Sequence, residues 1–320
     1  DAADLIASGT VQGSTGSDIL VVNDSTIDLR STSLSSVENI QAGTTDDTSF
    51  RVDQADLVAS GTVTGNSGND ELKANATSVD LRSTTLSSVE KLTAGLSTAT
   101  TFTIDLADLS STTAGTVTGS SGSDTLVVMD TAIDLSSTTS TTLVSVETIK
   151  AGKSTATTFT VDMADLLSGG SVVGSSASDT LLVMDSAIDL RSTSLSSVEI
   201  IKAGTTDATT FTVNQADLGA GGTNSAVIST TTQTTDTILA ADTVLDLSST
   251  ALTGIEVLQA NSAAGTTFKV NQADLGAGGT DSAVTGHTSG SDVLMAMDTA
   301  LNLTSTVLTS VEKLAAGKST

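Results

Sequence analysis

The chain has 320 residues, with 12 Lys and Arg against 37 Asp and Glu, and its formal net charge is −25. A field of this sign repels a phosphate backbone, which excludes nucleic acid as a partner. The chain contains no Cys, which excludes a disulfide scaffold and a thiol active site, and its 2% aromatic content leaves few ring faces for a cofactor cleft. No apolar run has the length needed to cross a bilayer, so we expect no membrane insertion.

One pattern recurs through the whole chain. The tripeptide Ala-Asp-Leu contributes Asp4, Asp56, Asp108, Asp165, Asp217 and Asp274, and a Val-Glu or Ile-Glu pair contributes Glu38, Glu90, Glu147, Glu199, Glu256 and Glu312. Two anchors that keep their order at a spacing of 52 to 57 residues define a tandem array. We divide the chain into six repeats: residues 1–52, 53–104, 105–161, 162–213, 214–270 and an incomplete 271–320.

Within a repeat, short runs rich in β-branched residues follow one another, separated by Gly, Ser, Asn and Asp. In chain order around the fourth repeat they cover residues 159–161, 171–173, 180–184, 187–190 and 198–202. Apolar and polar residues alternate within these runs, which predicts strands with one buried face. No segment sustains a helical period, so we expect about five strands in each repeat and no helices.

These strands predict an all-β fold, a tandem-repeat parallel β-solenoid of the β-helix or β-roll kind. A repeat has too few large side chains to fill the wide interior of a separate sandwich, whereas a solenoid coil needs only a narrow aliphatic core that its neighbours cover. We predict two or three coils in each repeat and one continuous solenoid. Length differences between repeats fall in Ser-, Thr- and Gly-rich segments such as residues 219–224 and 276–281, which we interpret as surface loops.

Aspartates recur at three places in the repeats and are candidate calcium ligands, because calcium is bound by carboxylate oxygens. The first series ends a Gly-containing turn and comprises Asp18, Asp70, Asp124, Asp179, Asp236 and Asp292. The second comprises Asp24, Asp130, Asp185, Asp242 and Asp298, and the third comprises Asp28, Asp134, Asp189 and Asp246. The spacing of Asp53 and Asp56 gives a further oxygen cluster. Two interpretations stay open: these residues cap backbone amides at corners, or they gather cations that offset their mutual repulsion.

The first series lies in segments that join a Gly and small residues to Asp-x-Leu, at residues 13–20, 65–72, 119–126 and 286–294. These segments resemble the half-repeat of repeat-in-toxin, or hemolysin-type, calcium-binding proteins secreted by bacteria. Residues 28–38 and 189–199, Asp-Leu-Arg-Ser-Thr-Ser-Leu-Ser-Ser-Val-Glu, resemble a segment of bacterial surface-layer proteins and type I secreted adhesins. The resemblance implies an extracellular, cell-surface location and calcium as the bound ion. Because the turn occurs once per repeat, any calcium site has to be assembled within a repeat from different turns.

The sequence offers no catalytic constellation, and we expect the protein not to be an enzyme. The Glu38 series supplies one carboxylate per repeat without a second acid or base at a fixed short spacing, so we expect it to be solvated beside residues such as Lys91. Arg30, Arg82 and Arg191 each follow an Asp by two residues, as in a weak surface ion pair. Two alternatives are a ligand-binding adhesin module, for which the Gly-rich loops of the fifth and sixth repeats are the candidates, and a β-helix enzyme that degrades polysaccharides.

Both ends of the sequence interrupt the repeat. The chain begins with Asp-Ala-Ala-Asp and ends with Ala-Gly-Lys-Ser-Thr, and one Phe-centred strand is missing between this end and that beginning. This pattern indicates either a piece of a longer array of the same repeat or open ends that stack head to tail. The sequence as a whole predicts a non-catalytic extracellular structural array, part of a surface layer, surface filament or large adhesin, that is stabilised by cations.

Overall fold

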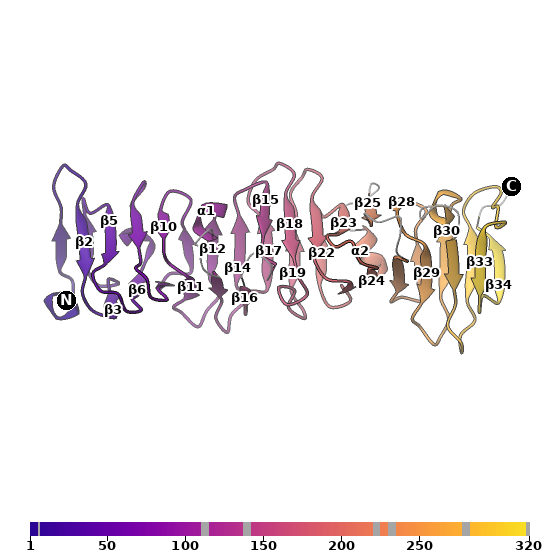
Figure 1. The fold of residues 1–320 in the computed structure, drawn as a ribbon, viewed down its shortest axis with the longest axis horizontal. Helices are drawn as coiled ribbons and strands as arrows, with labels where there is room; N and C mark the ends of the chain where they lie inside the picture. Colours follow the sequence, from indigo (N-terminus) through magenta and orange to yellow (C-terminus); the bar gives the residue numbers. More distant parts are fainter. Residues whose placement is uncertain are drawn as a thin grey trace. The chain divides into compact units, whose positions relative to one another are not determined.

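A computed structural model of the chain describes residues 1–5, 7–109, 115–136, 142–219, 225–229, 235–276 and 282–317. They form two compact units, Asp1–Lys153 and Ser154–Thr320, which we call the N-terminal and C-terminal units. Each unit is a parallel β-solenoid, and together they contain about 12 turns of the solenoid, here called coils (Figure 1). The prediction of an all-β, tandem-repeat parallel solenoid is therefore confirmed. The Gly-rich loops predicted at residues 219–224 and 276–281 lie almost entirely outside the described residues.

In the N-terminal unit, all paired strands of the described residues are parallel. One sheet contains, in order, β3 (Thr26–Asp28), β6 (Ser49–Val52), β8 (Glu71–Ala74), β11 (Lys91–Ala94), β13 (Thr116–Thr118) and β16 (Thr142–Val144). A second contains β2 (Ile19–Val22), β5 (Asn39–Ala42), β7 (Thr62–Thr64) and β10 (Thr85–Ser87). A third row contains β9 (Ser78–Asp80), β12 (Thr101–Ile104), β14 (Thr125–Val128) and β17 (Thr148–Ala151). The remaining strands are β1 (Thr10–Gln12), which pairs with β4 (Ser33–Ser35), and β15 (Ala132–Asp134).

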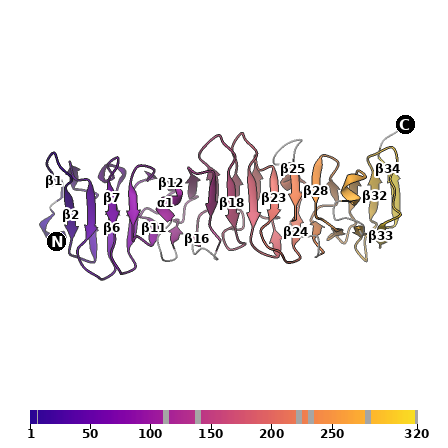
Figure 2. The same cartoon turned by 45° about the horizontal axis from the view of Figure 1, so that its top comes forward.

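The C-terminal unit repeats this arrangement, and Figure 2 shows its strands from a second side. One row contains β18 (Thr158–Val161), β20 (Thr180–Val183), β23 (Ile200–Ala203), β25 (Ser225–Ile228) and β28 (Thr250–Thr253). A six-stranded sheet contains β21 (Ala187–Asp189), β24 (Thr210–Val213), β26 (Thr237–Ala240), β29 (Val257–Ala260), β31 (Ser282–Thr285) and β33 (Thr306–Thr309). The others are β19 (Ser171–Val173), which pairs with β22 (Ser194–Ser196), and the sheet of β27 (Val244–Asp246), β30 (Thr267–Val270), β32 (Val293–Ala296) and β34 (Lys313–Ala316).

In repeat 4 the Ala-Asp-Leu segment forms a turn, and in the other five repeats these segments form short helices that the sequence did not predict. They are η1 (Ala2–Asp4), η2 (Gln54–Asp56), α1 (Leu106–Leu109), α2 (Gln215–Gly219) and η4 (Ala273–Leu275). Reciprocal capping closes a single turn: the Asp53 side chain accepts a hydrogen bond from the Ala55 amide at 2.8 Å, and the Asp56 side chain accepts one from the Asp53 amide at 2.9 Å. A single turn is too short to show a 3.6-residue repeat of apolar positions, so the hydrophobic pattern of the sequence did not predict it.

A repeat does not correspond to a whole number of coils. In the N-terminal unit β3 pairs with β6, and β4 and β5 come between them in the sequence. Likewise β6 pairs with β8, and η2 and β7 come between them in the sequence. Each coil therefore contains three elements. Repeat 2 contains η2 and the six strands from β7 to β12, one strand more than expected. Seven elements divided by three per coil give 7/3 coils, between the two and three predicted. Each repeat is therefore displaced by one face of the solenoid relative to the previous repeat.

The core is a narrow stack of side chains that align from coil to coil. In the six-stranded sheet of the N-terminal unit the strand register superposes Ile27, Phe50, Leu72, Leu92, Val117 and Leu143. Each of these side chains is buried, and burial of a side chain of this size stabilises the fold by roughly 1.5–3 kcal/mol. Each coil relies on its neighbours to cover this stack, as the sequence predicted.

Candidate functional site

The first aspartate series binds main-chain groups of three successive coils. Asp70 is fully buried, and one carboxylate oxygen accepts a hydrogen bond from the Asn66 amide of its own turn at 2.7 Å. The other oxygen accepts one from the Thr48 amide of the preceding coil at 2.7 Å. The Asp70 amide donates to the Glu90 carboxylate of the next coil at 2.8 Å. We call this Thr–Asp–Glu arrangement the aspartate staple.

The aspartate staple recurs with nearly constant geometry. The Thr amide lies 2.6–2.7 Å from the Asp oxygen and the Asp amide 2.7–2.8 Å from the Glu oxygen in Thr48–Asp70–Glu90, Thr100–Asp124–Glu147, Thr157–Asp179–Glu199, Thr209–Asp236–Glu256 and Thr266–Asp292–Glu312. Asp18 keeps the bond to Glu38, at 2.9 Å. The Glu series was expected to be solvated beside Lys. This expectation is wrong for Glu90, which is buried, whereas the other five glutamates are partly or fully exposed; all six carboxylates accept a backbone amide. The sequence could not reveal the partner of each Glu, because the Asp amide that it accepts lies at least 20 residues away in the chain.

The second aspartate series caps the short helices. Carboxylates of this series accept hydrogen bonds from an amide at the start of the short helix, or of the turn that replaces it in repeat 4. The pairs are Ala2 to Asp24, Leu106 to Asp130, Met163 to Asp185, Gln215 to Asp242 and Gln272 to Asp298. The unpaired amides at a helix start favour such a negative partner. In repeat 2 Ala76 occupies this position, and the helix start has no such cap.

The third aspartate series caps the corner that follows a strand. Asp28 and Asp189, and Asp80 at the equivalent position of repeat 2, which was not among the predicted ligands, each accept the amide of the residue two positions on. Each also accepts a bidentate bond from that residue's Arg side chain. The Arg hydrogen bond holds the pKa of all three carboxyls below the usual value. Asp134 and Asp246 accept the amide and hydroxyl of a Ser instead, Ser136 or Ser248.

The three series occupy different corners, so the structure does not bring the predicted calcium ligands together. Among the described residues, no three His, Cys, Asp or Glu side chains are close enough to hold a metal ion. The hydrogen bonds of all three series match the interpretation of these residues as backbone caps. Calcium binding stays a prediction.

Four of the five short helices contain a buried carboxylate, the Asp of the Ala-Asp-Leu anchor. Asp56, Asp108, Asp217 and Asp274 are at most 5% exposed. Burial raises the pKa of each to about 7, although a backbone hydrogen bond acts in the opposite direction. The sequence signal is an Asp that is invariably flanked by Ala and Leu. These carboxyls therefore titrate near neutral pH.

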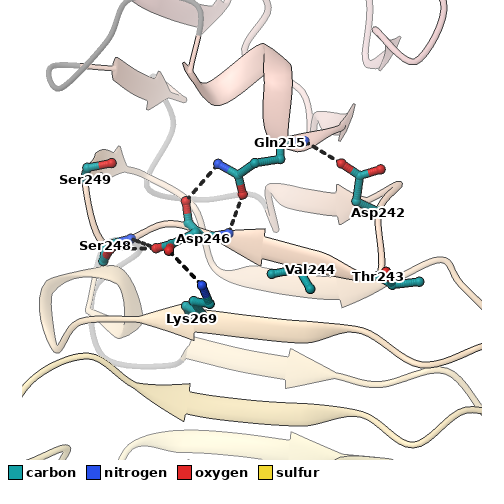
Figure 3. A pocket seen from close by; sticks show the side chains of 8 residues that line it. All are labelled: Gln215, Asp242, Thr243, Val244, Asp246, Ser248, Ser249 and Lys269. Carbon is teal, nitrogen blue, oxygen red and sulfur yellow. Dashed lines mark hydrogen bonds and ion pairs between the residues drawn. The ribbon is translucent and has the colours of Figure 1, made fainter. Parts of the chain in front are cut away.

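The C-terminal unit also contains a polar pocket, of about 540 Å³, between α2, β27 and β30 in repeat 5 (Figure 3). Gln215 of α2 bridges to the main chain of Asp246, whose amide donates to Gln215 Oε1 at 2.6 Å. On the opposite side, Lys269 Nζ lies 3.2 Å from Asp246 Oδ2. Figure 3 shows Asp246 between these two side chains, with Asp242 and Val244 further along the same strand segment. The pocket thus combines donors, acceptors and an apolar side chain.

Comparisons with known proteins do not assign the chain to a family. No family model, no curated protein and no solved structure matches it. No helix within the described part of the chain is long and apolar enough to span a membrane. The resemblance to repeat-in-toxin and surface-layer repeats stays a prediction, and function has to be argued from the contacts described above.

Proposed function

We propose that the chain is a non-catalytic, extracellular structural array, part of a surface layer, surface filament or large adhesin. The observation that carries this proposal is the aspartate staple, which is repeated through both units and is directed at the main chain of neighbouring coils. Side chains that act on a substrate converge on one place, whereas these are distributed evenly along the repeats. Such an arrangement supports a mechanical role.

The staple explains how coils resist separation. Lifting the coil of Thr48 away from that of Asp70 breaks the aligned strand pairs and also leaves a buried carboxylate without its amide partner. A hydrogen bond to a charged group contributes about 1.5–3 kcal/mol, and leaving such a group buried and unpaired costs more. Load applied to one coil is therefore carried by several bonds that break together.

We propose further that cations, calcium among them, offset the net charge of −25. Thermal unfolding in calcium, in chelator and in sodium chloride of matched ionic strength tests this. A saturable rise in the melting temperature that only calcium produces supports bound calcium. An equal rise in matched sodium chloride reduces the effect to charge screening and removes calcium as a specific cofactor.

The structural role is tested on cells and on the purified chain. Immunogold labelling of intact cells of the source organism should mark their outer surface, and electron microscopy of the purified chain, with and without calcium, should show filaments or sheets if copies associate head to tail. Absence of label from intact cells, with label inside permeabilised cells, contradicts the extracellular array. Dispersed monomers in every condition would contradict head-to-tail association of copies. The remaining alternative would then be a longer array of the same repeat within one chain.

A further inference from the structure

We propose that the pocket between α2, β27 and β30 binds a neutral, polyhydroxylated ligand of the saccharide class. This inference is independent of the structural role of the array. It rests on a place where repeat 5 alone combines a short side chain, which it shares with repeat 3, with a cation.

The pocket lies at a position where repeats 1, 2 and 4 have an Arg, whereas repeat 5, like repeat 3, has a Ser. In repeats 1, 2 and 4 an Arg side chain covers the carboxylate of the third aspartate series, as Arg82 covers Asp80 with Nε 2.9 Å from Oδ1. In repeat 5 the equivalent residue is Ser248, whose hydroxyl reaches the Asp246 carboxylate at 2.6 Å and occupies far less space. The position of Lys269 is held by Thr in repeats 2, 3 and 4. The combination of a short residue and a cation at these two positions is confined to repeat 5.

The polar groups of the pocket match a hydroxyl, which both donates and accepts. Lys269 Nζ carries three donors, and within the described residues its hydrogen bond is the one to Asp246. Asp242 uses one oxygen for the Gln215 amide, at 2.7 Å, and its other oxygen accepts no hydrogen bond from the described residues. Exposed Thr243 and Ser249 add hydroxyls to the lining. Neighbouring hydroxyls of one sugar ring can therefore accept from the ammonium and donate to the carboxylate.

The charge balance selects a neutral ligand. Two carboxylates and one ammonium line the pocket in a chain of net charge −25, which disfavours an anion. The Lys269 ammonium beside Asp246 repels a metal ion or a protonated amine, so it disfavours a cationic ligand. Val244, which is 42% exposed, presents methyl groups on which the C–H face of a sugar ring can pack. Because the lining has no aromatic ring, we expect weak affinity, with a Kd of about 1 mM.

Methyl-selective NMR on the full chain tests the inference, with the Val244 methyl groups as reporters. Titration with glucose, galactose and mannose should give a saturable shift of these methyl signals for at least one hexose. Ser248→Arg introduces the residue of repeats 1, 2 and 4 and should weaken binding at least about tenfold by filling the pocket. Lys269→Thr, which introduces the residue of repeats 2, 3 and 4, should weaken it as well.

Matched controls separate binding from folding. Asp242→Asn should weaken binding, whereas Asp185→Asn makes the same change at the equivalent helix cap of repeat 4 and should leave binding unchanged. Glucuronate and glucosamine should bind less tightly than the neutral hexose. The inference is overturned if no hexose shifts the Val244 signals saturably, if Ser248→Arg and Lys269→Thr both bind with the original affinity, or if a charged sugar binds best.

Discussion

At the scale of single residues, a Gly of one coil lies so close to the backbone of a Ser in the next coil that no side chain fits between them. A Cβ atom at Gly174 would lie 1.8 Å from the carbonyl oxygen of Ser197, and the equivalent Gly of repeats 1, 2, 3 and 6 has the same contact at 1.7–1.8 Å. Ser197 itself has a left-handed backbone with φ of 51°. Repeat 5 exchanges the two residues: Ser229 takes the Gly position, and Gly254, with φ of 65°, takes the Ser position. In repeat 5 the residue without a side chain is therefore on the second coil of the contact and not on the first.

We expect Gly174→Ser to lower the free energy of unfolding by about 2 kcal/mol, because the new side chain collides with backbone. Adding Ser197→Gly reproduces the pair of repeat 5 and should restore at least half of that loss. Urea unfolding of the two single variants and the double variant measures the coupling between the positions. Additive effects would show that the exchange in repeat 5 is unrelated to this contact.

The aspartate staple gives a second prediction at this scale. Asp70→Ala leaves the amides of Thr48 and Asn66 without their carboxylate and should cost about 3 kcal/mol. Asp18→Ala is the matched control: Asp18 accepts the Ser14 amide but has no Thr partner in the described residues, so it should cost about 1 kcal/mol. Amide hydrogen exchange at Thr48 reports the lost contact directly. Equal losses for the two variants would contradict the role of the inter-coil bond.

At the scale of elements, the short helices hold carboxyls that couple stability to pH. The pKa of Asp56, Asp108, Asp217 and Asp274 is raised from 3.8 to about 7, mainly by burial. The folded chain therefore binds more protons than the unfolded chain between these values, and stability falls as pH rises through that interval. The carboxyls beside Arg, whose pKa is lowered, act in the opposite direction and lose their contribution only as pH falls below the ordinary Asp range.

We expect the melting temperature to fall between pH 5 and pH 8, as the buried helix carboxyls ionise. Replacing all four with Asn keeps an acceptor for the capping amide and removes the ionisation, so the slope should flatten. Differential scanning calorimetry across this range compares the two chains. A melting temperature that rises with pH in the original chain, or an unchanged slope in the variant, would refute the assignment.

At the scale of each unit, the contacts between coils should survive the removal of a whole repeat but not the removal of a single coil. Deleting residues 53–104, one repeat, brings Thr48 to Asp124 and Phe50 to Leu126, which are the counterparts of its present partners Asp70 and Leu72. Deleting residues 62–84 removes one coil, β7 to β9, and leaves Thr48 and Glu90 without the Asp that joins them.

We predict that the chain lacking residues 53–104 folds cooperatively, whereas the chain lacking residues 62–84 loses protection around its new junction. Circular dichroism with urea and amide exchange distinguish the two outcomes. Comparable exchange protection in both deletions would mean that the thickness of a coil, and not the order of its elements, determines stacking.

Much of this architecture could be predicted from the sequence, because alternating strands and two anchors that recur in a constant order leave few alternatives to a solenoid. The capping role of the aspartates was one of two open interpretations. The buried position of Glu90 and the short helices could not be predicted, because they depend on which elements meet across coils. The pocket beside Lys269 was missed because it arises from a smaller side chain, Ser248, on an element separated from it by a full coil.

The displacement of each repeat by one face has an evolutionary consequence. Recombination between repeats changes the chain by whole repeats, and each gain or loss of one repeat turns every later residue of that solenoid by a third of a revolution. A side chain retained unchanged would then face a new direction. Only the gain or loss of three repeats, or a multiple of three, returns later residues to their original direction around the solenoid axis. The number of repeats therefore determines both the length of the solenoid and the direction in which its later side chains face.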